Sequence, residues 1–198
     1  MKRWNHMMVA VCMAAAAVAC SGDPEPADTA RADRPEAVGT SGEAKAEAGR
    51  ADRDFVGDML AGGRAEVDLG KLAQQKARNK QVKDFAAMMV RDHTKAAAEL
   101  KTVATQANID VTTVDADMGD NKDAHDRLAK LSGMEFDREY MQMMVDKHEK
   151  TVDELESKAE RADNDHVKQW AAKALPTVKK HLEQARQIDE SLEKRSGS

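Results

Sequence analysis

The chain has 198 residues, of which 34% are charged and 3% are aromatic, with two cysteines and a formal net charge of −5. This length is enough for one folded domain. A sequence rich in Ala, Glu, Lys and Leu with only four prolines favours a helical protein, because straight-chain side chains lose little rotamer freedom in a helix. The acidic balance and six aromatic residues provide neither a basic stripe nor a stacking surface, which excludes nucleic-acid binding.

The first twenty residues have the pattern of an export signal. Lys2 and Arg3 precede an uncharged run rich in Ala, Val and Met over residues 7–19, which is too short to span a bilayer as a helix. The run ends in Ala-Val-Ala-Cys at residues 17–20, which resembles the lipobox of bacterial lipoproteins. In that motif the signal is cut before the cysteine, which then receives lipid. We therefore predict a signal peptide over residues 1–19 and a membrane anchor on Cys20.

Two details qualify this prediction. The residue three positions before Cys20 is Ala17, where lipoproteins usually have Leu, and ordinary cleavage nearby is the alternative. Ser21 resembles the residue that permits transfer to the outer membrane, so we expect the periplasmic face of that membrane. Because Cys12 leaves with the signal, the folded part contains no cysteine, which excludes disulfides.

The segment that follows predicts a disordered tether over residues 20–51. Residues 21–50 hold three of the four prolines, seven alanines and four glycines, and Val38 is the only large apolar residue among them. Such a stretch cannot bury enough surface to offset the entropy of ordering it. The folded domain is therefore expected over residues 52–195.

From Asp52 onward, apolar residues recur at steps of three and four, which predicts helices with one buried face. We expect helices over 53–78 and 80–107, a short linking helix over 122–131, a third main helix after Ser132, and a fourth capped by Asp163 or Asn164. Short links make the first and second main helices antiparallel, and likewise the third and fourth. The long connection between the second and third main helices permits the one-crossover topology of a ferritin-like four-helix bundle.

Each of the four apolar stripes is interrupted by a polar residue near the middle of its helix: Glu66, His93, His148 and His181. Residues at the midpoints of packed helices lie at the same level, so these four should face one another. One carboxylate and three imidazoles together can bind Zn, Mn, Fe or Cu, so the pattern predicts a metal site. The alternative is a metal-free Glu and His network that only sets the packing of the helices.

The sequence argues against a standard di-iron centre, because such centres need Glu-x-x-His pairs. The residues three before the stripe histidines are Val90, Val145 and Val178. Asp92, beside His93, points away from the stripe and could instead be a partner for a histidine of a neighbouring helix. Catalytic motifs such as Gly-x-Ser-x-Gly or HExxH are absent from the sequence, so no enzyme activity can be assigned.

Several short motifs together resemble one bacterial envelope family. They are Asp54-Phe55, Gly62-Gly63, Glu66-Val67, Leu69-Gly70, Asp92-His93-Thr94, Leu131-Ser132-Gly133, Phe136-Asp137, Tyr140, Met144-Val145, His148, Leu175-Pro176 and His181-Leu182. Over about residues 52–190 the chain resembles the family DUF4142, a domain of unknown function. The resemblance implies an all-α, ferritin-like bundle in the cell envelope.

Two functions follow as hypotheses. In the first, the lipid-anchored bundle holds one transition metal for storage, buffering or redox protection. In the second, it is a metal-free structural or protein-interaction module. The membrane is the one partner that the sequence predicts, and a homo-oligomer stays open.

Overall fold

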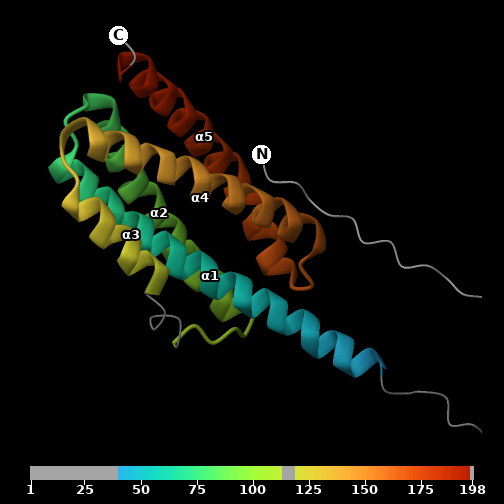
Figure 1. Cartoon of the computed structure of the whole chain (residues 1–198). Helices are drawn as coiled ribbons and strands as arrows, with labels where there is room; N and C mark the ends of the chain where they lie inside the picture. Colours follow the sequence, from blue (N-terminus) through green and yellow to red (C-terminus); the bar gives the residue numbers. More distant parts are fainter. Residues whose placement is uncertain (1–39, 113–118, 197–198) are drawn as a thin grey trace, which may run out of the picture. The chain divides into compact units, whose positions relative to one another are not determined.

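Five helices form the part of the chain that the computed structural model describes, residues 40–112 and 119–196 (Figure 1). They are α1 (Thr40–Lys76), α2 (Lys80–Gln106), α3 (Gly119–Lys130), α4 (Gly133–Arg161) and α5 (Asp165–Ser196). No strand occurs in these ranges, which confirms the predicted all-α fold. Among the described helices none is long and apolar enough to cross a membrane. The predicted signal peptide and Cys20 lie outside the described residues.

Helices α1 and α2 form one antiparallel hairpin, and α4 and α5 form another. The second helix of each hairpin begins with an asparagine cap, and the sequence predicted the one at α5. The side chain of Asn79 accepts a hydrogen bond from the backbone N–H of Gln81 at 2.8 Å. Asn164 accepts one from His166 at 3.0 Å, so of the two predicted caps of α5 it is Asn164 that fills the role.

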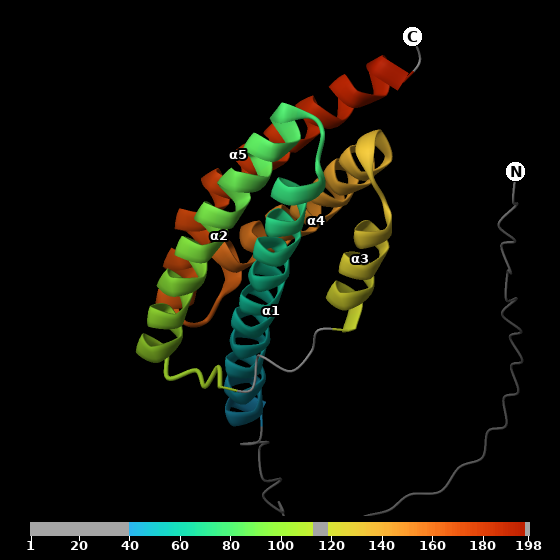
Figure 2. The same ribbon diagram turned by 90° about the vertical axis from the view of Figure 1, so that its left-hand side faces the viewer.

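The connection between α2 and α4, which contains α3, crosses from one end of the bundle to the other. The turn between α1 and α2 lies beside the start of α4, where Asp137 binds it. Helix α3 carries the chain back to that end, since the Lys76 ammonium at the end of α1 donates to the carbonyl of Ala129 near the end of α3. Helices α2 and α4 therefore run in one direction and α1 and α5 in the other, which is the predicted one-crossover topology. Figure 2 shows α3 on the side of α1 and α4, away from α2 and α5.

Two buried carboxylates clamp the hairpins together. Asp137 and Asp52 are 1% and 2% exposed, and each accepts hydrogen bonds from two backbone N–H groups in the turn of the other hairpin. The bonds run from Arg78 and Asn79 to Asp137 (3.0 and 2.8 Å), and from Asp163 and Asn164 to Asp52 (3.1 and 2.9 Å). Each hairpin therefore completes the turn of the other.

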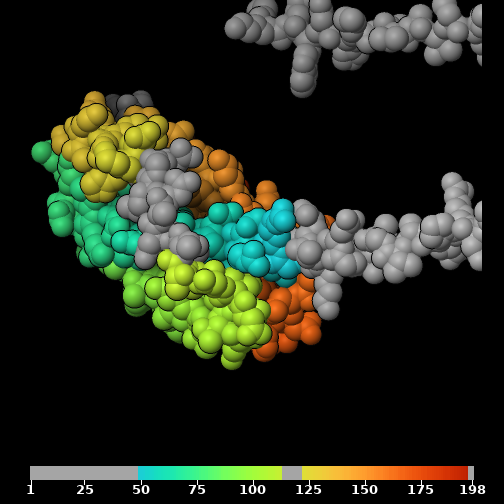
Figure 3. Space-filling model, turned by 90° about the horizontal axis from the view of Figure 1, so that it is seen from below, coloured from blue at the N-terminus to red at the C-terminus, as the bar shows by residue number. Residues whose placement is uncertain are grey.

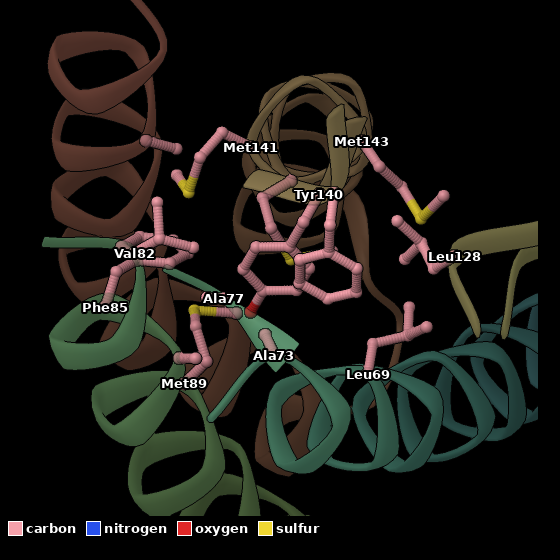
Figure 4. Close-up of a cluster of buried hydrophobic side chains, with 14 of the residues drawn as sticks. Leu69, Ala73, Ala77, Val82, Phe85, Met89, Leu128, Tyr140, Met141 and Met143 are labelled. Carbon is pink, nitrogen blue, oxygen red and sulfur yellow. The ribbon is translucent and has the colours of Figure 1, made fainter. Parts of the chain in front are cut away.

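The apolar core is divided into two clusters. Figure 4 shows the first, in which Leu69, Phe85 and Met89 surround Tyr140, and Leu128 adds a side chain from α3. The second cluster contains the following buried large residues: Phe55, Leu60, Leu100, Leu155 and Trp170. It includes the contact between the end of α2 and the start of α5, seen side by side in Figure 3. On every main helix, the predicted polar residue lies between these two clusters.

Two expectations about helix ends need correction. Helix α1 begins at Thr40, so residues 40–50 are helical and the predicted disorder over 20–51 is wrong for them. The sequence there is rich in Ala, Glu and Lys, which favour helix. A segment without apolar residues cannot pack into a core, but it can still extend a helix whose next turns are held by packing. Helix α4 begins after Ser132 as predicted, but the Ser132 side chain makes no capping hydrogen bond.

Candidate metal centre

The structure brings the four predicted polar residues together in one layer. Glu66 comes from α1, His93 from α2, His148 from α4 and His181 from α5. The three imidazole rings are mutually adjacent, with centroid separations of 5.6 to 5.8 Å. His148 and His181 are 1% and 2% exposed, and Glu66 is also buried. One ring nitrogen from each histidine lies within 4.8 Å of those of the other two, an arrangement that can hold a metal ion.

On each ring, one nitrogen has an acceptor. Nδ1 of His93 lies 3.1 Å from Oε2 of Glu66, and Nε2 of His181 lies 3.1 Å from Oδ2 of Asp92. Nδ1 of His148 donates to the backbone carbonyl of Met144 at 2.8 Å, with Glu66 Oε1 at 3.8 Å. These acceptors hold a proton on that nitrogen and fix the orientation of each ring, as partners of metal-binding histidines do.

The other nitrogen of each ring has no partner. His93 Nε2, His148 Nε2 and His181 Nδ1 are buried and make no hydrogen bond within the described part of the chain. Buried polar atoms without a partner are rare in folded proteins, because they lose their bonds to water without replacement. Here three of them belong to adjacent rings, and all three offer a lone pair.

Burial keeps two of the rings neutral. It lowers the pKa of His181 to about 4, although the hydrogen bond to Asp92 acts in the opposite direction. Burial also lowers the pKa of His148 and outweighs the negative charge of Glu66. Burial alone would raise the pKa of Asp92, but hydrogen bonds from Arg91 and His181 lower it overall. Neutral imidazole is the form that binds metal ions, so these two rings are ready for a metal at neutral pH.

The layer fits a small metal ion after modest closure. Metal–nitrogen bonds of about 2.0 to 2.1 Å in a tetrahedral site place the nitrogens roughly 3.4 Å apart, so a gap of up to 4.8 Å must close by up to about 1.4 Å. Glu66 contacts Nδ1 of His93, not the nitrogen that has no partner.

Asp92 contacts His181 of the neighbouring helix α5, as the sequence predicts. The carbonyl of Met144 was missed, although its position four residues before His148 was a usable signal.

Two cavities reach this layer. One, of about 550 Å³, lies between α2 and α5 and is lined by Asp92, His93 and His181. The other, of about 240 Å³, is lined by Glu66 and His93 together with residues of α4 and α5. The layer is therefore buried but reachable from outside.

The two other histidines of the described residues do not join the layer. His166 is exposed near the start of α5, and the side chain of His125 in α3 is 45% exposed. Cys20, the predicted lipidation site, lies outside the described residues.

Two solved structures share this fold. A protein of Streptomyces coelicolor described as secreted and assigned to the family DUF305 matches with a TM-score of 0.60 and 17% identity, over 74% of this chain and 94% of its own. CopM in its Cu(II)-bound form matches with a TM-score of 0.56 and 21% identity, over 71% of this chain and 96% of its own. At these identities the likeness establishes the fold alone. No curated protein matches the chain significantly.

The family assignment rests on the sequence. The model of the family DUF4142, a domain of unknown function, matches residues 37–188. The match covers most of the chain and begins close to Thr40, where α1 starts. The chain therefore belongs to the DUF4142 family, as its motifs predict.

Proposed function

We propose that the protein is a lipid-anchored envelope protein that binds one divalent transition-metal ion through His93, His148 and His181. The observation that carries this proposal is a cluster of three histidines in which one nitrogen of each ring lies within 4.8 Å of those of the other two and each ring has a buried nitrogen without a hydrogen-bond partner. In the proposed site Glu66 and Asp92 hold the outer nitrogens of His93 and His181. Glu66, a candidate ligand by sequence, thus becomes a positioning residue.

The metal-free alternative explains less of this layer. A Glu and His network that served only packing would be expected to satisfy its own polar atoms. The pair of Glu66 and His93 does so on one side, but the inner nitrogens stay unpaired. Each such atom costs about 1 to 3 kcal/mol when buried. A metal ion would remove all three penalties at once.

Imidazole ligands favour some of the four predicted metals over others. Mn²⁺ prefers oxygen ligands, whereas imidazole suits Zn, Cu and Fe. For a given set of nitrogen ligands the affinity of divalent ions is highest for Cu²⁺. One structural neighbour, CopM, is described in a Cu(II)-bound form. We therefore place Cu(II) first and Zn(II) second.

The setting suggests storage or buffering rather than catalysis. A single ion on three nitrogens, reached through a cavity, can be bound and released without unfolding the bundle. A lipid on Cys20 would keep this capacity at the membrane surface, and the motif of residues 17–20 supports it. The DUF305 neighbour is itself described as secreted.

The experiment uses residues 21–198, purified without a His tag. Elemental analysis after loading should find one metal ion per chain. Thermal unfolding with Cu(II), Zn(II), Mn(II) and Fe(II) should then show stabilisation of about 2.7 kcal/mol at a hundredfold excess over Kd. His181→Leu should lose this stabilisation, whereas His166→Leu, at an exposed histidine of the same helix, should keep it.

The result that contradicts the proposal is equally definite. If His181→Leu and the wild-type chain respond alike to all four metals, the layer holds no metal. The metal-free structural module would then be the better description.

A further inference from the structure

The lining of the cavity between α2 and α5 contains more basic than acidic side chains. Four cationic side chains line it: Arg91, Lys95, Lys173 and Lys180. Two carboxylates line it as well, Asp92 and Glu99. The excess of positive charge contrasts with the net charge of −5 of the whole chain. This cavity therefore attracts anions on a protein whose overall charge repels them.

The two carboxylates are already engaged. Asp92 contacts Arg91 at 2.9 Å and His181 at 3.1 Å. Glu99 contacts Lys173 at 3.0 Å and Lys95 at 4.0 Å. Lys180 is exposed and makes no ion pair with any described residue. At least one cation at this cavity is thus available to a ligand.

The cavity also opens on the histidine layer. His93 and His181 line it, whereas His148, at 1% exposure, does not. Three nitrogen ligands leave at least one position of a four-coordinate ion open. Since the rings of His93 and His181 border the cavity, an open position on that side would face it. A bound divalent ion would add further positive charge there.

The size of the cavity suits a small organic molecule. Its volume of about 550 Å³ falls within the range of about 300 to 1,000 Å³ that is usual for ligand pockets. Its lining includes the apolar side chains of Met88, Trp170 and Val178, which can contact a short carbon chain. A ligand with an anionic group at each end could reach the metal with one end and the lysines with the other.

We propose that this cavity binds a small organic dicarboxylate, one carboxylate of which completes the coordination of the metal ion while the other is held by Lys180 and Lys95. The proposal rests on the proposed metal site, because the first carboxylate needs the ion. The lysine ammonium groups bind the second carboxylate of the ligand. A dicarboxylate should therefore bind more tightly than a monocarboxylate.

The test uses the chain of residues 21–198 loaded with Cu(II), with succinate as the probe. Succinate is titrated at pH 7 and low ionic strength, and binding is followed by electron paramagnetic resonance and visible absorption of the copper. Succinate should shift both spectra in a saturable way. Acetate, which lacks a second carboxylate, should need at least a tenfold higher concentration for the same shift. Gel filtration should show that the copper stays on the protein.

Charge-reversed variants test the role of the lysines. Lys180→Glu and Lys95→Glu should each weaken succinate binding by about five- to tenfold, as expected for reversing an exposed charge near an anion. Both should still bind one copper ion. Lys83→Glu makes the same charge change at an exposed position of α2 outside the cavity and should bind succinate like the wild type.

The possible failures are distinguishable. If copper binds but succinate leaves its spectra unchanged or removes it from the protein, the dicarboxylate site is refuted and the metal site stands. Equal succinate affinities for Lys180→Glu and Lys83→Glu would also refute it. If no copper binds to the wild-type chain, the proposed function itself fails.

Discussion

Replacing His148 by leucine distinguishes a metal site from a packing network, because the two hypotheses predict opposite changes in the free energy of unfolding of the metal-free protein. His148 is 1% exposed, and its Nε2 has no hydrogen-bond partner in the described structure. Leucine of similar volume removes that unpaired atom, which costs about 1 to 3 kcal/mol, and also the bond from Nδ1 to Met144, which is worth about 1 kcal/mol. The metal-free variant should therefore be as stable as the wild type, or up to about 2 kcal/mol more stable.

The metal response should change in the opposite direction. At a hundredfold excess over Kd, the metal should stabilise the wild type by about 2.7 kcal/mol, or roughly 5 to 10 °C in thermal midpoint for a domain of this size. His148→Leu should show almost none of this shift. The assay is thermal unfolding followed by circular dichroism, with and without Cu(II), after exhaustive removal of metals from both proteins.

One result would refute this reasoning. If the metal-free His148→Leu chain is destabilised by more than about 2 kcal/mol, then His148 is needed for packing or hydrogen bonding in the absence of metal. A metal shift of the same size in both proteins would point to binding elsewhere.

Three further predictions concern other parts of the chain. Because burial lowers the pKa of His181 to about 4, below the value of about 6.5 in the unfolded chain, stability should fall as the pH drops from 7 toward 4, by up to about 3 kcal/mol. Urea unfolding at pH 7.5, 6 and 5 should give a flatter profile for His181→Leu. Asp137→Ala should lower the free energy of unfolding by about 3 kcal/mol, because two backbone N–H groups lose their acceptor, and Asp137→Asn should lower it less; denaturant unfolding measures both. Cys20→Ser should abolish labelling by a radioactive fatty acid and membrane fractionation; a variant that still carried label would exclude Cys20 as the anchor.

The sequence was sufficient for the helices and for the level of the polar layer. Asn79 and Asn164 mark helix starts because a cap acts within a few residues and needs no tertiary contact. The layer was predictable because a polar residue that interrupts an apolar stripe must lie in the core. Its position at the centre of each helix then fixes its height in the bundle.

The inner details were not predictable in the same way. Which nitrogen of His93 faces inward depends on Glu66 of another helix, and sequence spacing carries no information about ring orientation. The cavity depends on how α2 and α5 pack, so the role of Lys180 is visible only in the structure. Helix α1 extends to Thr40 through residues whose burial the sequence pattern does not require.

The reciprocal clamps of Asp52 and Asp137 belong to a sequence pattern that occurs twice in the chain. These two residues are 85 positions apart, and so are the caps Asn79 and Asn164. At the same spacing, the chain repeats Asp-Arg at 52–53 and 137–138, and Asn-x-x-Val-Lys-x-aromatic-Ala-Ala at 79–87 and 164–172. The two hairpins therefore share a short sequence pattern at matching positions, and each provides the carboxylate that binds the turn of the other.

The two hairpins differ in sequence where the histidine layer lies. At the 85-residue spacing, His148 corresponds to Gly63, and His93 corresponds to Val178. Asp52 and Asp137 preserve the symmetric joint between the halves, while the histidines occupy positions that the other half fills with a small or apolar residue. The two hairpins thus share the contacts that join them but differ at the centre, where Glu66 lies on one side of the histidine layer and the basic cavity opens on another.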